Sequence, residues 1–261
     1  MVNAADYTGM GENYRKYRIG YSESVITQLI KHTGILKKNG QVVDVGAGTG
    51  IWTRQLAEKG IKCIAVEPNP SMSKEGKKYT QDLNNITWVD GNAEVTNLED
   101  NCADWVTMAS AFHWTDERRS LPEFHRILKE EGYITLIWNP LVKKGDPIQE
   151  AVESLIKKEV PEFKRIRAEI NYSQLLEQSG YFKDVYEVKE VNIIERPLEQ
   201  YLAAWNAVTD LKAQAGEERF ARVITGITKI VKELSHEREE IAVPYLTRSW
   251  TAKKINGGKH T

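Results

Sequence analysis

The sequence contains few cysteines and no long hydrophobic run. Its 261 residues include two cysteines, Cys63 and Cys102, which are too few for a disulfide framework or a metal cluster of the usual spacing. The longest strongly apolar run, residues 133–138, is far shorter than the ~20 residues that a membrane span needs. Residues 1–18 contain no apolar segment of the kind found in secretory signals. We therefore expect a cytoplasmic protein with no membrane association and no bound metal.

The chain also lacks an excess of charge of either sign and any internal repeat. Its 36 lysines and arginines are balanced by 37 aspartates and glutamates, which gives a net charge of −1. Proteins dedicated to nucleic-acid binding usually carry a basic excess, so no nucleic-acid partner is expected. The hydrophobic share of 41% and the charged share of 28% are those of an ordinary globular protein. Nothing in the sequence indicates an oligomeric state.

The first half of the chain alternates short buried strands with helices. A helix is expected from the N-cap Ser22 to the C-cap Gly34. Another is expected over residues 120–129, where Ser-Leu-Pro-Glu has capping-box spacing with proline in the first turn. Strands alternating with helices favour a doubly wound, mostly parallel α/β sheet. The remaining helices are expected at residues 49–59 and 71–80, and the strands at 41–46, 61–67, 86–90, 103–110 and 133–138.

The second half ends in two strands that are separated by helices. Helices are expected at residues 147–159 and 172–179, and the two strands at 185–194 and 241–251. Between those strands the pattern predicts helices at residues 198–208 and 217–234. An insertion of this length is too long for a plain loop and covers a pocket or forms a partner surface. We expect a seven-stranded sheet with a helical cap inserted before the last strand.

The clearest motif is a glycine-rich turn after the first strand, with the sequence Asp-Val-Gly-Ala-Gly-Thr-Gly at residues 44–50. Glycines let the backbone turn tightly and approach a ligand closely. The dinucleotide fingerprint Gly-x-Gly-x-x-Gly requires glycine where this chain has Ile51. Asp44 lies at the strand end, and its negative carboxylate is better suited to binding a ligand with an ammonium group than a ligand with a pyrophosphate.

A second acidic residue, Glu67, ends the next strand, at the place where a carboxylate hydrogen-bonds a ribose diol. Together, Asp44, the glycine turn and Glu67 indicate a nucleoside with a cationic arm and no phosphate. S-adenosylmethionine has that chemistry. The alternative interpretation is a glycine-rich turn that binds nothing.

With AVEPNPSM, DGNAE, ASAFHWTD and FHRILKEEGYITLIWN further along, this motif resembles the class I S-adenosylmethionine-dependent methyltransferases over residues 14–140. The segment YRKYR at residues 14–18 and FHW at residues 112–114 are similar to the small-molecule enzymes of the trans-aconitate methyltransferase group. The resemblance implies one methyltransferase domain over residues 1–261. Within it, the resemblance implies a cofactor-binding core at 41–140, and we expect an N-terminal lid and first helix at 1–34 and, from the helical insertion between the last two strands, the cap at 197–234.

The resemblance also implies roles toward S-adenosylmethionine, whose product is S-adenosylhomocysteine. The residues expected at the methionine part are Asp44, Gly46, Ala47 and Gly48, with Gly50 shaping the turn. Glu67 is expected to hold the ribose hydroxyls. The residues expected around the adenine are Pro68, Met72, Asn92, Ala93 and Glu94. For Met72 and Ala93 the alternative is plain packing. Ala109 is expected under the sulfonium. Tyr14 and Arg18 are expected over the cofactor, because an arginine pairs well with a carboxylate.

The acceptor side is expected after the fourth strand, at the carboxyl edge where ligands bind in open α/β sheets. His113 is the candidate catalytic residue there, as general base or hydrogen-bond donor, and Trp114 is expected to form a wall. The other expected acceptor-binding residues are Tyr17, Asn139 and Trp205. For His113 the alternative is a packing role.

These expectations define a methyltransferase with a small-molecule acceptor, methylated on a carboxylate or hydroxyl oxygen. A hydroxyl acceptor needs a base and a carboxylate does not, which bears directly on the role of His113. Three alternatives stay open. They are a cofactor-binding regulatory or partner protein without transfer activity, an N- or C-methyltransferase acting on a natural product, and a nicotinamide-dependent dehydrogenase, against which the glycine spacing argues.

Overall fold

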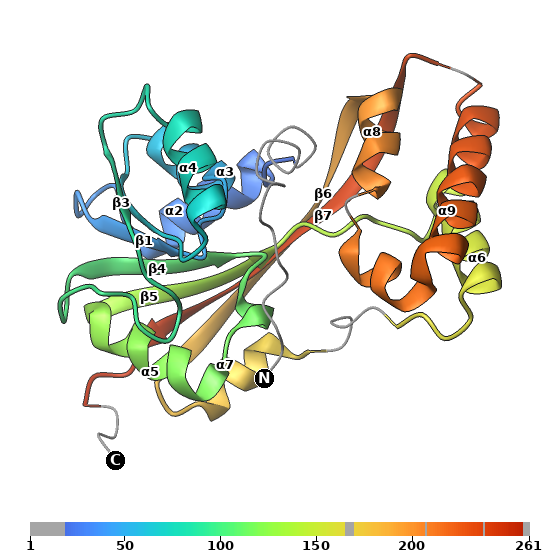
Figure 1. Cartoon of the computed structure of the whole chain (residues 1–261). Coiled ribbons are helices and arrows are strands. Elements are labelled where there is room, and N and C mark those ends of the chain that lie inside the picture. Colours follow the sequence, from blue (N-terminus) through green and yellow to red (C-terminus); the bar gives the residue numbers. More distant parts are fainter. Residues whose placement is uncertain (1–18, 165–169, 207, 237, 258–261) are drawn as a thin grey trace. The chain divides into compact units, whose positions relative to one another are not determined.

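The described residues form a seven-stranded sheet in the order β3-β2-β1-β4-β5-β7-β6 (Figure 1). This computed structural model describes residues 19–164, 170–206, 208–236 and 238–257. Strands β1 to β5 pair in parallel, and β7 pairs antiparallel with β5. The predicted fold class, a doubly wound and mostly parallel sheet, is therefore confirmed. The strands are β1 (Gln41–Val45), β2 (Lys62–Val66), β3 (Ile86–Val89), β4 (Ala103–Ala109), β5 (Leu128–Trp138), β6 (Phe182–Pro197) and β7 (Glu240–Lys254).

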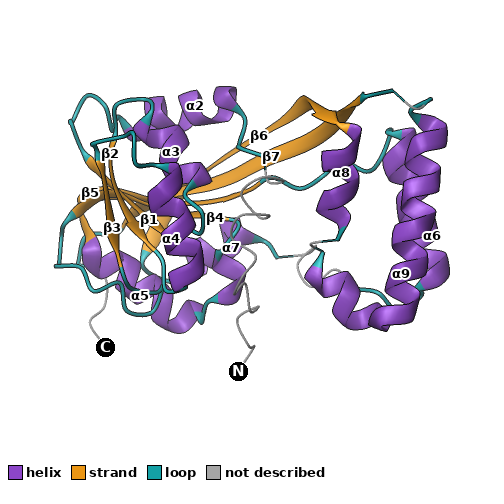
Figure 2. Ribbon diagram, turned by 45° about the horizontal axis from the view of Figure 1, so that its top comes forward, coloured by secondary structure: helices purple, strands orange, loops and turns teal. Residues whose placement is uncertain are grey.

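Helices cover both faces of the parallel strands (Figure 2). Neighbouring residues of β1 point to opposite faces. Val42 packs in a cluster with α2 and α3, and Val43 packs in a cluster with α5 and α7. Because both faces are buried, these strands are continuous hydrophobic runs rather than alternating ones. The helices around this sheet are α2 (Glu23–Thr33), α3 (Ile51–Ala57), α4 (Pro70–Tyr79), the 3₁₀ turn η1 (Phe112–Trp114), α5 (Glu117–Ile127) and α7 (Tyr172–Gln178).

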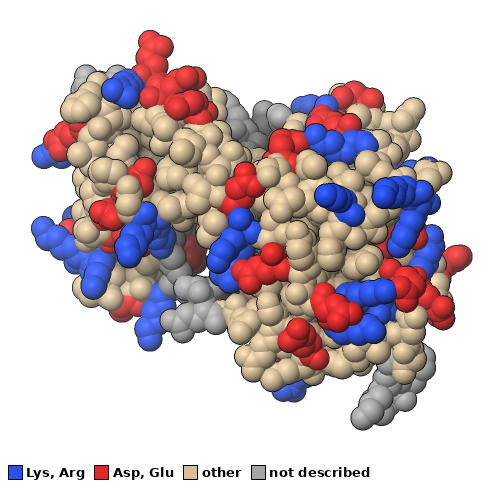
Figure 3. Space-filling view, turned by 180° about the vertical axis from the view of Figure 1, so that it is seen from behind, with Lys and Arg blue, Asp and Glu red and all other residues tan. Residues whose placement is uncertain are grey.

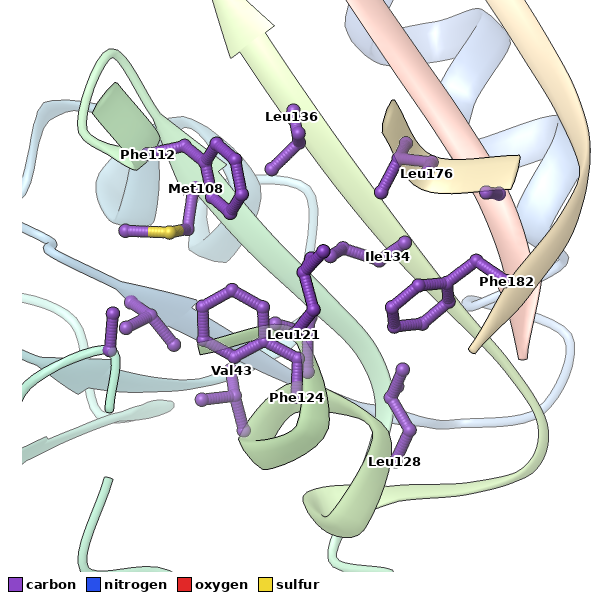
Figure 4. Packing of buried hydrophobic residues seen from close by; sticks show 14 of the residues in the cluster. Val43, Met108, Phe112, Leu121, Phe124, Leu128, Ile134, Leu136, Leu176 and Phe182 are labelled. Atoms are coloured by element: carbon purple, nitrogen blue, oxygen red, sulfur yellow. The ribbon is translucent and has the colours of Figure 1, made fainter. Parts of the chain in front are cut away.

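The ends of α2 are those that the sequence predicts. The Ser22 hydroxyl accepts a hydrogen bond from the backbone N–H of Val25, and Gly34 closes the helix in the left-handed conformation with φ 65°. Figure 4 shows side chains of α5 pointing toward the strands, where Leu121 and Phe124 join the buried cluster of Val43.

Helix α5 begins earlier than the sequence predicts. Its N-cap is Asp116, whose carboxylate accepts from the backbone N–H of Arg118 at 3.1 Å. Ser120 is instead fully buried inside the helix, and Pro122 lies in the helix interior. The capping-box spacing was misleading because an aspartate four residues upstream supplies the cap, and the helix ends at Ile127 rather than at residue 129.

The chain divides into two compact units. The first comprises Met1–Asn139, Asn171–Glu190 and Thr247–Thr261, and the second comprises Pro140–Ile170 and Val191–Leu246. The second unit contains α6 (Pro147–Glu159), α8 (Leu198–Trp205) and α9 (Thr209–Leu234). The helices expected between the last two strands are thus present, and α6 groups with them. The domain limits and the cap role of residues 197–234 stay predictions.

Two of the helices in the second unit pack closely. A Cβ added to Gly226 of α9 would lie 2.7 Å from a terminal methyl of Leu155 on α6, so a larger residue at this position would require the Leu155 side chain to shift. Helix α9 is interrupted at Gly216, which has φ 74° and ψ 165°. This interruption explains why the helical pattern in the sequence is clear only from residue 217 onward.

Among the described residues, no helix is long and apolar enough to cross a membrane. Figure 3 shows lysine and arginine interspersed with aspartate and glutamate on the face that it presents. The predictions about nucleic acid and cellular compartment stay predictions.

Candidate cofactor and acceptor site

The glycine turn folds back onto the end of β2. The backbone N–H groups of Gly46 and Ala47 both donate to the Val66 carbonyl, at 2.8 and 3.1 Å. Gly46, Gly48 and Gly50 have φ of 70°, 58° and 77°, in the left-handed region that only glycine adopts readily. A Cβ on Gly46 would lie 2.8 Å from the Cβ of Ala111, which follows β4. The turn therefore lies at the β1–β4 border, where the strand order reverses and ligands bind in open α/β sheets.

Glu67 joins the glycine turn to the turn that follows β2. One carboxylate oxygen accepts from the backbone N–H of Gly48 at 2.8 Å, and the other accepts from Asn69 at 2.9 Å. Glu67 is 8% exposed. Burial raises its pKa, and the two backbone hydrogen bonds oppose that rise. The buried Met72 lies nearby, with its methyl carbon 3.6 Å from where a Gly48 Cβ would be.

Asp44 lies beneath the turn and is fully buried. Its carboxylate accepts from the hydroxyl of Thr53 on α3 at 2.6 Å and from that of Thr107 on β4 at 3.2 Å. Burial raises the pKa of Asp44 to about 7. The two threonine hydrogen bonds oppose this, and the nearby Glu67 adds to it. The structure thus shows Asp44 tying the start of α3 to β4, and its predicted contact with the methionine part stays a prediction.

Two buried polar atoms in this region have no hydrogen-bond partner within the described parts of the chain. They are the Thr49 hydroxyl, in the glycine turn, and the Trp52 indole nitrogen, in the first turn of α3. Both residues are 2% exposed. Buried polar groups in folded proteins are nearly always hydrogen-bonded, so these two groups are candidates for contact with a bound water or ligand.

The residues expected at the adenine edge form a compact loop after β3. The Asn92 amide oxygen accepts from the backbone N–H groups of Glu94 and Val95, at 3.0 and 2.8 Å. Glu94 in turn accepts from the backbone N–H of Asp116 at 2.8 Å. Ala93 is buried in the core, and Pro68 is exposed. The two polar side chains therefore shape the loop, and their contact with adenine stays a prediction.

His113 lies in the 3₁₀ turn η1, directly after β4. Its ring centre is 5.0 Å from that of Trp114, and the indole N–H of Trp138 donates to its Nδ1 at 3.4 Å. All three side chains are half-buried. Ala109 is the last residue of β4 and is also half-buried. The structure thus gathers the predicted acceptor residues His113 and Trp114 with Trp138, which the sequence places at the end of the fifth strand as a candidate floor of the same pocket.

Asn139 is engaged with the segment before α2. Its amide donates to the Gly20 carbonyl at 2.8 Å, and its oxygen accepts from the Thr247 hydroxyl at 2.8 Å. Gln55 of α3 exchanges two 2.9 Å hydrogen bonds with the Tyr21 backbone. Asn139 therefore anchors this segment, and its predicted contact with an acceptor stays a prediction.

Tyr21 reaches the end of β4 from this anchored segment. Its hydroxyl lies 2.9 Å from that of Ser110, a non-glycine residue with φ 55°. Its ring meets the Trp52 ring edge-on at 5.1 Å. Sequence reasoning missed Tyr21, Ser110 and Gln55, because no local pattern indicates such long-range partners.

The remaining predicted residues lie elsewhere. Trp205 belongs to the second unit, where it is 5% exposed and meets Tyr201 edge-on at 6.3 Å. Tyr14, Tyr17 and Arg18 lie outside the described residues. Within the described ranges, no group of three or more histidine, cysteine, aspartate or glutamate side chains could hold a metal ion.

Residues 43–136 match the family model described as "Methyltransferase domain". An uncharacterized methyltransferase of Mycobacterium bovis is 34% identical over 126 residues, which cover 43% of this chain and 51% of that protein. The uncharacterized methyltransferase YcgJ of Bacillus subtilis is 26% identical over 140 residues, covering 52% of this chain and 55% of that one. The chain therefore spans about half the length of the curated relatives that it matches.

Solved structures share the fold across most of the chain. A candidate Type II methyltransferase from Anaeromyxobacter dehalogenans is 18% identical, with a TM-score of 0.66 over 91% of this chain and 97% of that one. A geranyl diphosphate methyltransferase in complex with SAM is 14% identical, with a TM-score of 0.50 over 89% and 85% of the two chains. The fold is thus the Rossmann-like methyltransferase fold, and residues 43–136 match the model of a methyltransferase domain. The resemblance to the trans-aconitate methyltransferase group is not confirmed.

Proposed function

We propose that this chain transfers a methyl group from S-adenosylmethionine to an oxygen atom of a small-molecule acceptor. The observation that carries the proposal is the Glu67 carboxylate, which is held against the glycine turn by Gly48 and Asn69 at the end of β2. A carboxylate in that place accepts hydrogen bonds from both hydroxyls of a ribose. The match of residues 43–136 to a methyltransferase domain supports the same cofactor.

The described residues fit S-adenosylmethionine. The glycine turn leaves room for close backbone approach, Glu67 supplies ribose acceptors, and the Thr49 hydroxyl is a buried polar group without a partner in the described chain. Pro68, Met72 and the loop of Asn92, Ala93 and Glu94 are proposed around the adenine. Asp44 is proposed to support the turn through Thr53 and Thr107.

When bound, S-adenosylmethionine supplies a methyl group on a positively charged sulfur, which is already a good leaving group. The work left to the chain is to bind, orient and exclude water. Ala109, at the end of β4, is proposed to lie under the sulfonium. His113, directly after β4, and Trp138, at the end of β5, are proposed to face the acceptor. The role of residues 197–234 as a cap, with Trp205 contacting the acceptor, stays a proposal from the sequence.

Calorimetry with S-adenosylmethionine and S-adenosylhomocysteine tests the cofactor. Glu67→Ala removes the ribose contact and is expected to weaken binding by roughly 1.5–3 kcal/mol, the usual contribution of hydrogen bonds to a charged group. The matched control is Glu177→Ala, an exposed glutamate on α7, which should leave the affinity unchanged. An unchanged affinity in Glu67→Ala would contradict the assignment of this site.

A screen of acids, alcohols and amines for release of S-adenosylhomocysteine tests the reaction. Turnover of an acid or alcohol supports O-methylation, and turnover of an amine would replace it by N-methylation. Cofactor binding without turnover of any class would favour the alternative of a regulatory or partner protein. Binding of a nicotinamide dinucleotide instead would favour the dehydrogenase alternative.

A further inference from the structure

We propose that Trp138 is a positioning residue that fixes His113 as a hydrogen-bond donor to the methyl acceptor and prevents it from acting as a general base. The proposal rests on the proposed function for the identity of the acceptor side. The hydrogen bond between the two side chains belongs to the protein alone and is testable without any substrate.

The Trp138 indole N–H lies 3.4 Å from Nδ1 of His113 and donates to it. An indole nitrogen is a donor only, so Nδ1 must supply a lone pair to this contact. A neutral imidazole carries one proton, and the nitrogen that accepts cannot also carry it. The proton of His113 is therefore on Nε2.

Packing from two other elements fixes the orientation of the indole. Trp138 stacks on Tyr172 of α7, with ring centres 4.2 Å apart and planes 20° apart. It also meets Trp250 of β7 edge-on, at 5.7 Å and 74°. Tyr172 and Trp250 are 5% and 4% exposed. These two buried rings fix the orientation of the Trp138 indole and therefore the direction of its N–H.

The backbone around His113 is equally constrained. In the η1 turn, the N–H of Trp114 donates to the Ala111 carbonyl at 2.9 Å, and the N–H of Thr115 donates to the Phe112 carbonyl at 3.1 Å. The Trp138 indole and the backbone turn that carries His113 are thus both held by contacts other than the His113–Trp138 hydrogen bond.

This arrangement removes the lone pair that a general base needs. To accept a proton, His113 would have to bind it on Nδ1, which the Trp138 N–H already occupies. The resulting imidazolium would place two N–H donors against each other. With Nδ1 accepting from Trp138, the proton of the neutral ring is on Nε2, and an Nε2–H is a donor suited to an oxygen with lone pairs.

The acceptor that fits a donor without a base is an oxygen that is already ionised, which at neutral pH means a carboxylate. The carboxylate oxygen forms a bond to the methyl carbon while the carbon–sulfur bond breaks. The electron pair of the broken bond stays on sulfur, which becomes a neutral thioether, and the acceptor becomes a neutral methyl ester. No proton moves in this step.

Nitrogen-15 NMR of the labelled wild-type chain tests the tautomer directly, and His113→Ala identifies the resonances. We expect Nε2 of His113 to be protonated and Nδ1 to be unprotonated. The indole proton of Trp138 should move in His113→Ala and stay in place in His125→Ala, whose Nε2 contacts the Ile255 carbonyl instead. A protonated Nδ1, or an indole proton indifferent to His113→Ala, would overturn the proposal.

Kinetics on an accepted substrate separate a donor from a base. Glutamine places a side-chain N–H near the position of Nε2 but cannot act as a base at neutral pH. His113→Gln should stay within a few-fold of wild-type kcat/KM, while His113→Ala should raise the acceptor KM by roughly ten- to a hundredfold, as expected for one lost hydrogen bond to a charged group. Equal loss of kcat in both variants would show that His113 is a base and overturn the proposal.

Trp138→Phe keeps a ring on Tyr172 and removes the N–H. We expect unchanged affinity for S-adenosylmethionine, a several-fold higher acceptor KM and a His113 tautomer population that shifts toward Nδ1–H. An unshifted tautomer population in this variant would overturn the positioning role. If the wild-type chain binds no S-adenosylmethionine, the proposed function fails while the NMR result still decides the hydrogen bond.

Discussion

The two compact units of this chain encode their structures in different ways. The first unit contains the parallel strands, a turn with three left-handed glycines and fully buried polar groups such as Asp44 and Thr107. The second unit contains three helices, and exposed ion pairs join the end of α6 and the turn after it to α9. The family match at residues 43–136 falls entirely in the first. In the glycine turn of the first unit, the backbone conformation limits which residue types can occupy each position. The helices of the second unit need mainly a periodic pattern of hydrophobic residues.

The largest expected difference between the units comes from their glycines. Gly46→Ala introduces a left-handed alanine and a Cβ 2.8 Å from that of Ala111. Backbone strain and overpacking together should destabilise the chain by about 2–5 kcal/mol. Gly216→Ala in the second unit has φ 74° and ψ 165°, a backbone conformation that is essentially restricted to glycine, but the new Cβ has open space around it, so backbone strain alone should cost about 1–3 kcal/mol. Urea unfolding of both variants measures the difference, and equal losses would contradict it.

The next difference is in pH dependence. Burial raises the pKa of Asp44 to about 7, above the value near 3.9 expected when the chain is unfolded. The folded state therefore holds a proton that the unfolded state releases, and this stabilisation is lost as the pH rises through the folded pKa. Between about pH 5.5 and pH 8, wild type should lose ~2 kcal/mol of unfolding free energy that Asp44→Asn does not lose.

The matched control for that measurement is Glu162→Gln in the second unit. A hydrogen bond from its own backbone N–H and an ion pair with Arg219 lower the pKa of Glu162. The stability that Glu162 contributes is lost only as the pH falls through that lowered pKa. Between about pH 5.5 and pH 8, the unfolding free energy of Glu162→Gln should therefore change with pH as it does in wild type. If the unfolding free energies of wild type and Asp44→Asn change equally with pH over this range, Asp44 is ionised in the folded chain at every pH tested.

A smaller effect is expected from the buried hydroxyl of the second unit. Gln149, which is 3% exposed, donates to the Tyr201 hydroxyl at 2.8 Å. Tyr201→Phe leaves that amide without its partner and should destabilise the unit by about 1–3 kcal/mol. Faster amide hydrogen exchange in α6 and α8 is the measurement. Tyr186→Phe in the first unit, where the ring stacks on His32, is the control and should change little. Unchanged exchange in Tyr201→Phe would mean that water replaces the hydroxyl.

The smallest effect is expected at the surface of the second unit. Arg222, with a side chain 51% exposed, pairs with Glu159 of α6 and Glu218 of α9. Exposed pairs of this kind contribute roughly 0–1 kcal/mol, so Arg222→Ala should lower stability by less than about 1 kcal/mol. Thermal unfolding at low and high salt measures it. A larger loss would mean that α9 depends on its charges and not mainly on its buried face.

The fold was largely predictable because its signals are local. Ser22 and Gly34 mark the ends of α2, and the helix at residues 147–159 matches α6 residue for residue. The start of α5 was wrong because two candidate caps, Asp116 and Ser120, lie within one turn of each other. Local spacing does not decide between them, whereas burial of Ser120 in the folded chain does.

The site was predictable only in part, for the same physical reason. The glycine turn and Glu67 follow from strand ends that the sequence displays, and the structure joins them through Gly48. The partners of Asp44 are nine and 63 residues away. Trp138 and Tyr21 likewise contact residues in distant elements. Nothing in a single sequence specifies such pairs before the sheet assembles.

The double anchoring of Glu67 has a consequence for sugar selectivity. A carboxylate offers about four lone-pair positions, and the Gly48 and Asn69 N–H groups fill one on each oxygen. One position remains free on each oxygen, which matches two neighbouring hydroxyls on one ring. Because the rotamer is fixed in advance, no side-chain entropy is lost when a diol arrives. If Glu67 holds the ribose as proposed, a 2′-deoxy analogue would leave one buried carboxylate oxygen unmatched, and we expect it to bind more weakly than the ribose form.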